Sequence, residues 1–172
     1  MKKIFLTGTI LFIALTMQAQ TSAIERLFEK YADREGFTTI TISGKLLGLF
    51  AGSEVRNDKE NVINSLSSIK ILTVDDSTLM SNINFYRELG GKSAFAGYEE
   101  LMDVKEGQDV TKFLIKQNGD RISELIVISG GPGDNTLISI KGDLDLKSLS
   151  ELSEGTGIEE LKDLEKVEGR KP

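Results

Sequence analysis

The chain has 172 residues, which is typical of one domain, and its 21 Lys and Arg against 27 Asp and Glu give a formal net charge of −6. It contains no Cys and no His, which excludes disulfides, thiol nucleophiles, Cys-bearing zinc sites and Ser-His-Asp triads. An acidic chain without a long basic run is also a poor candidate for binding nucleic acid, so we expect no nucleic-acid partner.

The first residues have the pattern of a secretory signal. Met1-Lys2-Lys3 is basic, residues 4–17 are mostly apolar, and Ala19 is a small residue suited to the cleavage position. The apolar run is shorter than the roughly 20 residues that cross a bilayer, although an uncleaved N-terminal anchor is the alternative. We therefore predict a signal peptide at residues 1–19 and no transmembrane segment after its removal.

Lipid attachment at the processing site would need a Cys, which the chain lacks. The processed protein is therefore expected to be acidic, soluble and either periplasmic or secreted, with no lipid anchor. A chain of about 150 residues can bury roughly 68–70% of its unfolded surface, so a core without disulfides is feasible.

The first predicted element is a helix over residues 22–35. Its apolar residues follow the i, i+3, i+4, i+7 spacing of one helical face. Ser22 and Glu25 have the spacing of a capping box, and Gly36 is suited to a left-handed stop. The apolar stripe consists of Ile24, Leu27, Phe28 and Tyr31.

Alternating elements follow in the N-terminal half. Residues 37–42 are β-branched and alternate, which predicts a strand, and residues 69–74 predict another. Short helices are expected at 45–50, after Asn57, and after Asp76, where Leu79, Ile83 and Tyr86 form a single stripe that ends at Gly90.

From Tyr98 the hydrophobic pattern changes to period two, which predicts four strands joined by short turns. The Asn118-Gly119 pair is a strong hairpin signal, and short turns between consecutive strands indicate an antiparallel meander. The apolar run 125–128 is expected to be a central strand covered on both faces. The predicted strands are Tyr98–Val104, Val110–Lys116, Ile122–Ser129 and Thr136–Lys141.

Two further helices, at 144–152 and 158–167, are expected before a charged tail at 169–172. The prediction for residues 22–168 is a single α+β domain. It has an antiparallel four-stranded C-terminal meander, an N-terminal half of alternating helices and strands, and one layer of helices on a sheet.

Residues 129–135 form a glycine-rich segment. A phosphate-binding loop needs backbone N–H groups at a helix start, usually with a nearby Lys. This segment runs from strand to strand, has no Lys, and loses one donor to Pro132. A hairpin turn is the better interpretation.

Carboxylates are the remaining candidates for chemistry. Asp143 and Asp145 could bind a calcium ion together, but a calcium site needs further oxygen ligands, and either Asp could instead cap the following helix. Asp134 lies about 30 Å from Asp143 along an extended segment, so the two cannot share a site. Asp75 and Asp76 have the position of helix caps. We predict no catalytic residue and no cofactor, and Asp143 and Asp145 are only weak metal candidates.

Aromatic and basic side chains also have structural interpretations. Tyr31 and Tyr86 lie in the apolar stripes of their helices, which favours the core over a stacking surface. Lys112 and Lys116 share one face of a strand and are expected to be solvated or to pair with Glu124 across the strands.

Two segments resemble a family of exported bacterial proteins known as domain of unknown function 4252, common in Bacteroidetes-type bacteria. One is Phe28-Glu29-Lys30-Tyr31 followed by residues 36–43, and the other comprises residues 124–128 and 138–146. The resemblance covers nearly the whole processed chain and implies a location in the cell envelope. It implies no catalytic residue. Many members carry a signal peptide or a lipoprotein signal, and this chain departs from the lipidated form because it has no Cys.

Two classes of function remain open. The first is an exported, non-catalytic module that binds an envelope protein or a small ligand, which includes a subunit that caps or delivers another envelope protein. The second is a hydrolase or lyase that uses carboxylates, with or without calcium. Two carboxylates with strongly shifted pKa values in one cleft would favour the enzyme, and an apolar concavity would favour binding.

Overall fold

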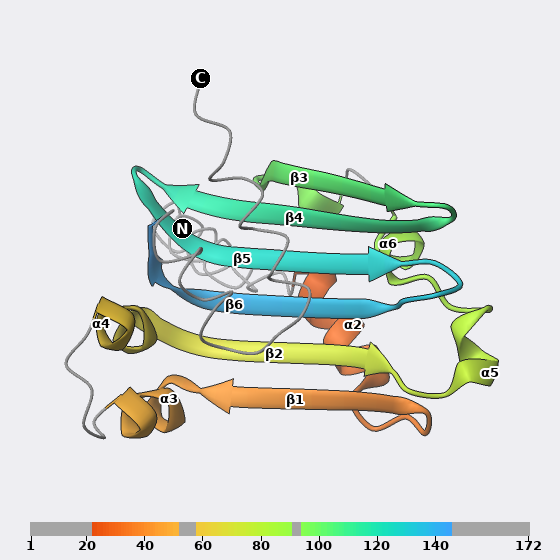
Figure 1. Ribbon diagram of the computed structural model, residues 1–172, viewed down its shortest axis with the longest axis horizontal. Helices are drawn as coiled ribbons and strands as arrows, with labels where there is room; N and C mark the ends of the chain where they lie inside the picture. The colour runs from red at the N-terminus through yellow and green to blue at the C-terminus, as the bar shows by residue number, and fades with distance from the viewer. Residues whose placement is uncertain (1–21, 52–57, 91–93, 146–172) are drawn as a thin grey trace, which may run out of the picture.

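One antiparallel sheet contains all the described strands. The computed structural model describes residues 22–51, 58–90 and 94–145 (Figure 1), and the strand order across the sheet is β1-β2-β6-β5-β4-β3. The strands are β1 (Phe37–Ser43), β2 (Leu66–Val74), β3 (Glu99–Glu106), β4 (Asp109–Asn118), β5 (Arg121–Gly130) and β6 (Thr136–Leu144).

The predicted meander is present as β3 to β6, but it is only part of the sheet. The prediction did not place the two N-terminal strands in the same sheet as the meander, but β2 pairs antiparallel with β6 and brings β1 with it. The register sets Ile69 opposite Ile140 and Ile71 opposite Ile138, so β-branched side chains continue across the junction. Pairing between strands so far apart in the chain leaves no local signal, which explains the omission.

Helices lie on both faces of this sheet, so the expected single layer of helices is wrong. Helices α2 (Ala23–Tyr31), α5 (Ser77–Met80) and α6 (Phe85–Glu88) pack on one face. Helices α3 (Gly44–Ala51) and α4 (Asp58–Ser65) lie at one end of the opposite face, where Leu47 and Val62 join its core (Figure 1).

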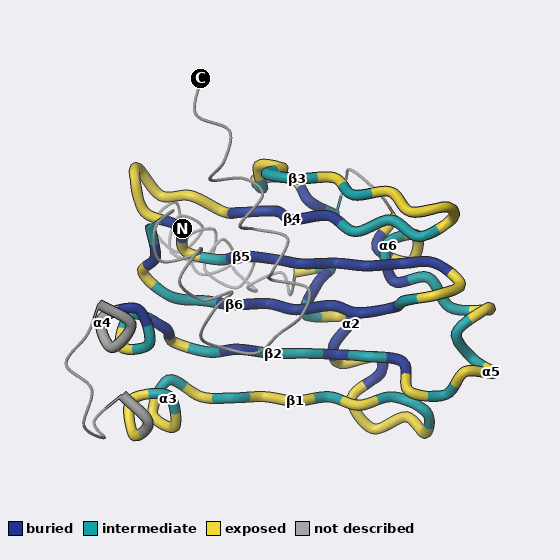
Figure 2. Tube along the Cα trace, in the orientation of Figure 1, coloured by how far each residue is buried: buried dark blue, intermediate teal, exposed yellow. Residues whose placement is uncertain are grey.

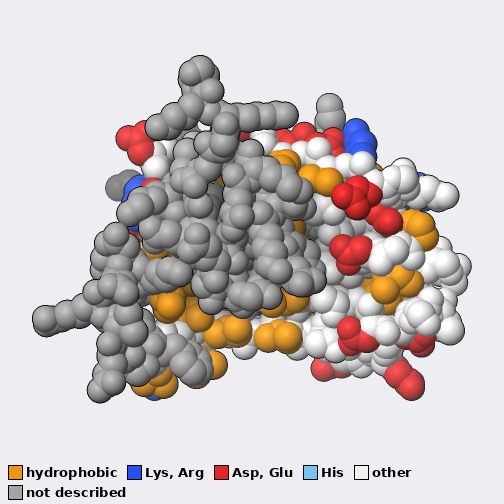
Figure 3. Space-filling view, viewed as in Figure 1, with side chains coloured by type: hydrophobic (Ala, Val, Ile, Leu, Met, Phe, Trp, Pro, Cys, Tyr) orange, Lys and Arg blue, Asp and Glu red, His pale blue; other side chains and the backbone are white. Residues whose placement is uncertain are grey.

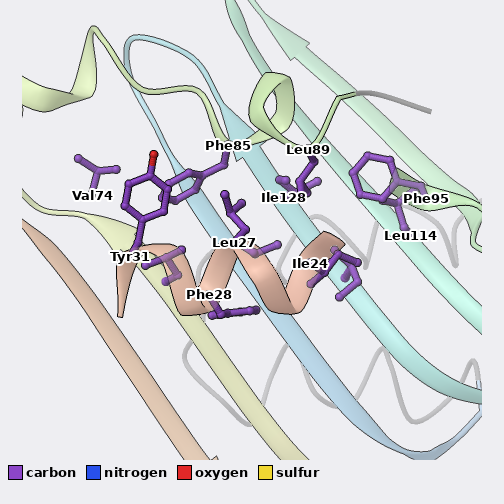
Figure 4. Close-up of a cluster of buried hydrophobic side chains, with 13 residues drawn as sticks. Ile24, Leu27, Phe28, Tyr31, Val74, Phe85, Leu89, Phe95, Leu114 and Ile128 are labelled. Carbon is purple, nitrogen blue, oxygen red and sulfur yellow. The ribbon is translucent and has the colours of Figure 1, made fainter. Parts of the chain in front are cut away.

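The first helix follows its sequence signals closely. Its predicted stripe is buried against the sheet (Figure 4), and the Ser22 hydroxyl accepts a hydrogen bond from the Glu25 backbone N–H at 3.0 Å. The helix ends at Tyr31, before the predicted Glu35. Gly36 has the expected positive φ, 83°, but it forms the turn into β1.

The single helix expected after Asp76 is two short ones, α5 and α6. Asp76 accepts from the Thr78 backbone N–H at 2.8 Å and begins α5. Asn84 accepts from the Arg87 backbone N–H at 2.9 Å and begins α6. This second cap reorients the chain and places Phe85 in the core with no exposed surface. Side-chain capping therefore overrides the helical spacing.

Both faces of the central strands are buried, as the apolar run 125–128 predicted. The run has no exposed surface (Figure 2), and its side chains alternate between two cores. The α2 face contains Leu72, Leu114, Ile126, Ile128 and Leu137, and the opposite face contains Phe113, Ile115, Leu125, Val127, Ile138 and Ile140.

The predicted hairpin at Asn118-Gly119 is confirmed. Asn118 pairs with Arg121, and Gly119 has a φ of 64°. The predicted signal peptide, charged tail and Asn57 cap lie outside the described residues. So do the two predicted C-terminal helices, apart from Asp145 and from Leu144, which ends β6 and not a helix.

A buried amide that sequence reasoning missed joins α6 to the sheet. Asn135 is only 1% exposed. Its Oδ1 accepts from the Phe85 backbone N–H at 3.1 Å, and its Nδ2 donates to the Gly131 carbonyl at 2.7 Å. The side chain thus connects α6 with the loop before β6.

We predict that Asn135→Ala lowers the free energy of unfolding by about 2–4 kcal/mol, because it leaves a buried donor and a buried acceptor without partners. Denaturant unfolding of the purified protein measures this value. The exposed Asn82→Ala is the control and should change stability by less than about 0.5 kcal/mol. Equal effects of the two variants would contradict the assigned role of Asn135.

Candidate functional site

The two weak metal candidates both face an arginine. Arg121 Nε lies 2.7 Å from Asp143 Oδ1, and Arg121 Nη1 lies 3.3 Å from Asp145 Oδ2. The hydrogen bond from Arg121 holds the pKa of Asp143 below its usual value. Asp143 lies within β6 and not at a helix start. The structure therefore brings Asp143 and Asp145 together, but around a guanidinium.

We expect millimolar calcium to leave the thermal midpoint of the protein unchanged, because a calcium ion would have to displace Arg121 from both carboxylates. Thermal unfolding with and without calcium measures this. A ligand that binds only the native state must raise the midpoint. A clear rise, abolished by Asp143→Asn, would establish the calcium site.

The other predicted acidic residues lie apart from this pair. Asp76 caps α5, and the hydrogen bond from the Thr78 hydroxyl lowers its pKa. Asp134 accepts from the Thr136 hydroxyl at 2.8 Å. Within residues 22–51, 58–90 and 94–145, no group of three or more metal-ligating side chains is placed to hold an ion.

The glycine-rich segment forms the connection from β5 to β6. Its Gly133 backbone N–H donates to the Asp109 carboxylate at 2.9 Å, and a Cβ on Gly131 would overlap the same carboxylate. The Gly133 N–H, which could otherwise have donated a hydrogen bond to a phosphate, thus donates to a carboxylate of the chain itself. This geometry agrees with a hairpin turn.

A chain of charged and polar groups crosses the α2 face around Glu124. Glu25, in the first turn of α2, pairs with Lys70 and lies 3.8 Å from Lys141 Nζ. Lys141 Nζ is in turn 3.7 Å from Glu124 Oε1. Glu124 also accepts hydrogen bonds from Tyr98 at 2.6 Å and from Ser139 at 2.8 Å. These contacts connect α2 with β2, β6 and β5.

Burial and the Glu124 carboxylate raise the pKa of Tyr98 well above its usual value. The phenol stays protonated at neutral pH and acts as a hydrogen-bond donor to Glu124. A tyrosine in that state cannot serve as a general base. The arrangement therefore suits a structural role for this cluster.

Lys112 is buried, contrary to the expectation of a solvated strand face. Its ammonium group lies 2.7 Å from Glu100 and 3.0 Å from Asp103, and 5.7 Å from the centre of the Tyr86 ring. Lys116 does stand opposite Glu124 in the strand register, but its ammonium group lies over the Tyr98 ring.

The pair of Lys112 and Asp103 makes stability depend on pH. Burial by itself would raise the pKa of Asp103, but hydrogen bonds from Lys112 and Lys105 outweigh it, and the pKa is lowered. A carboxyl whose pKa is lower in the folded state stabilises the protein above its unfolded pKa, and this contribution is lost as the pH falls through the folded pKa.

We predict that Asp103→Asn lowers the free energy of unfolding by about 1 kcal/mol at neutral pH. The difference in the free energy of unfolding between Asp103→Asn and the unmodified protein should shrink as the pH falls below about 4, because the Asp103 carboxyl is then protonated in the unfolded state. Denaturant unfolding between neutral and acid pH measures both curves. A constant offset across that range would contradict the pKa assignment.

A concavity lies between α2, the start of β1 and α5. It is a shallow groove of about 510 Å³ lined in part by Tyr31, Phe37 and Arg34. The Tyr31 and Phe37 rings stack with centroids 4.3 Å apart, and the Arg34 guanidinium lies 5.3 Å from the Tyr31 ring centre. Glu88 accepts hydrogen bonds from Lys30 at 2.6 Å and Tyr31 at 2.5 Å.

An exposed apolar surface lies at the β1 side of the sheet. Ile40 is 44% exposed, Leu46 43% and Leu49 69%, and these are the exposed large hydrophobic side chains of the described ranges. All three belong to β1 or to α3, which follows it directly. We call this surface the β1–α3 edge. In the face shown in Figure 3, hydrophobic side chains are visible at the lower left, near α3 and the adjoining part of the sheet.

The two outer strands differ sharply in composition. β3 has the sequence EELMDVKE, in which charged residues dominate. β1 has the sequence FTTITIS, with no charge and no Pro. Charged side chains protect a sheet edge from pairing with another chain, and β-branched uncharged ones favour pairing. Among the described strands, β3 is therefore a protected edge and β1 is an open one.

The comparison with family models matches residues 31–152 to a domain of unknown function, DUF4252. The chain belongs to this family. The comparison with curated proteins and that with solved structures returned no match. The DUF4252 region contains the six described strands, the β1–α3 edge and the lining residues of the groove. None of its described helices is long and apolar enough to cross a membrane.

Proposed function

We propose that this DUF4252 protein is an exported, non-catalytic interaction module of the bacterial cell envelope, and that it binds its partner through the β1–α3 edge. The observation that carries the proposal is the gathering of the exposed large hydrophobic side chains of the described residues on this one edge. Exposed apolar side chains that gather on one surface are a mark of interaction sites.

Export is supported by the N-terminal sequence. Lys2 and Lys3 precede a mostly apolar run, and Ala19 has the size required for cleavage. The absence of Cys argues against a lipid anchor, so the proposed location is the periplasm or the extracellular space. A core apolar on both sheet faces supports stability without disulfides in such a compartment.

The charged groups favour binding over catalysis. Asp76, Asp103 and Asp143 have lowered pKa values and lie on separate elements. A general acid needs a raised carboxyl pKa. Each of the three accepts a hydrogen bond from another side chain or ammonium group of the chain, so each has a structural role.

The backbone of β1 adds a second means of binding. A strand paired on one side only presents unpaired N–H and C=O groups to its surroundings. An extended segment can add to such an edge, where main-chain hydrogen bonds supply affinity and side-chain contacts supply selectivity. Ile40, in the middle of β1, and Leu49 on α3 would make those side-chain contacts.

A photoreactive amino acid placed at Leu49 tests the proposal in the cells that make the protein. We expect irradiation to give a covalent adduct with one defined protein from the Leu49 position. The same probe at Lys105, which is exposed on β3, is the matched control and should give little or none.

Mass spectrometry identifies the protein in the adduct. Ile40→Lys should abolish the Leu49 adduct, because a charge on the edge opposes strand pairing. Equal adducts from Leu49 and Lys105, or none from either, would reject the β1–α3 edge as the binding surface.

A further inference from the structure

We infer that the partner of the β1–α3 edge is a second copy of this chain, and that the β1 strands of the two copies pair antiparallel about Ile40 to form one continuous sheet. This inference rests on the proposed function and names the partner. A two-fold pairing of this kind uses the same surface on both copies, so that surface must be complementary to itself.

The sequence of β1 meets this requirement when Ile40 lies on the two-fold axis. The numbers of two facing residues then add up to 80, so Ile40 faces Ile40 of the other copy. Thr39 faces Thr41, and Thr38 faces Ile42. No charged residue lies on β1, so no like charges meet, and aliphatic and Thr–Thr cross-strand pairs are favourable.

The pairing would also cover apolar surface that is now exposed. Ile40 pairs with Ile71 of β2, and Ile42 with Ile69. Ile42, Ile69 and Ile71 belong to the core of the face opposite α2. That core therefore continues to Ile40, where it ends at the sheet border. A second Ile40 would extend it across the axis and remove both side chains from water, which is favourable for apolar surface.

Charges at the two ends of β1 specify the direction of pairing. Lys45 follows β1 and is exposed, whereas Glu35 precedes it and is also exposed. Asp75 lies at the Glu35 end, where it accepts from the Thr38 hydroxyl. Antiparallel pairing sets each Lys45 at the acidic end of the other copy, whereas parallel pairing would bring like charges together.

One buried hydroxyl in β1 lacks a partner. Thr39 Oγ1 is buried and makes no hydrogen bond in the described part of the chain. Thr41 of the second copy would stand opposite Thr39 on the same face. A Thr hydroxyl changes its direction with its χ1 rotamer, so the two hydroxyls can form a hydrogen bond across the axis.

Single cysteine variants test the register, because the chain contains no Cys of its own. Directly opposite residues of antiparallel strands have Cα atoms about 4.5–5.5 Å apart, which lies within the range of a disulfide. We expect Ile40→Cys in the processed chain to form a disulfide-linked dimer under mild oxidation. A mixture of Thr39→Cys and Thr41→Cys should form the mixed dimer faster than either variant alone.

Lys105→Cys on the β3 edge is the control and should stay predominantly monomeric. Light scattering should give twice the monomer mass for the unmodified protein and the monomer mass for Ile40→Lys. Ile40→Lys should leave the fold of the single chain intact, because Ile40 is half-exposed at the sheet edge. Its thermal midpoint should therefore equal that of the unmodified chain in its monomeric form.

A monomer at all concentrations, or equal disulfide formation by Ile40→Cys and Lys105→Cys, would overturn the inference. A dimer that survives Ile40→Lys would overturn it as well. If the chain is monomeric while Leu49 forms an adduct with a different protein, the second-copy inference fails and the proposed function stands. If no adduct forms at all, both fail.

Discussion

The burial of both faces of β5 and β6 is the constraint on which the rest of the structure depends. Ile126 and Ile128 point into one core, and Leu125 and Val127 into the other. A strand apolar at every position must be covered on both sides. The meander by itself also leaves one side of β6 without a neighbour, and β2 fills that place.

The polar groups of the α2 face follow from the same constraint. Glu124 lies on β5 directly before the buried run 125–128, and it is satisfied by Tyr98, Ser139 and Lys141. Lys112 is satisfied by Glu100 and Asp103, and Asn135 by backbone groups. Buried polar groups need such partners, which is why conspicuous side chains here stabilise the fold. Among the described residues, the exposed large hydrophobic side chains lie instead on the β1–α3 edge, which is the surface that we propose for binding.

Local signals predicted much of the fold. The Ser22 cap, the buried stripe of α2, the strand at β1, the Asn118-Gly119 hairpin and the meander all rest on contacts between residues near in sequence. The split of α5 from α6 was missed because the Asn84 cap competes with a stripe that spans both. The roles of Asn135 and Lys112 were missed because their partners, Phe85 and Glu100, lie on other elements.

The sequence by itself determined the element types, the order of the meander, the buried character of residues 125–128 and the exclusion of thiol and histidine chemistry. These follow from residue identity and short-range spacing. Only the tertiary structure decided that β2 joins β6, that helices lie on both faces and that Arg121 sits between Asp143 and Asp145. It also decided that, among the described strands, β1 is an open edge while β3 is a charged one. An edge is defined by which strand has no neighbour, and that depends on pairing between residues far apart in the chain.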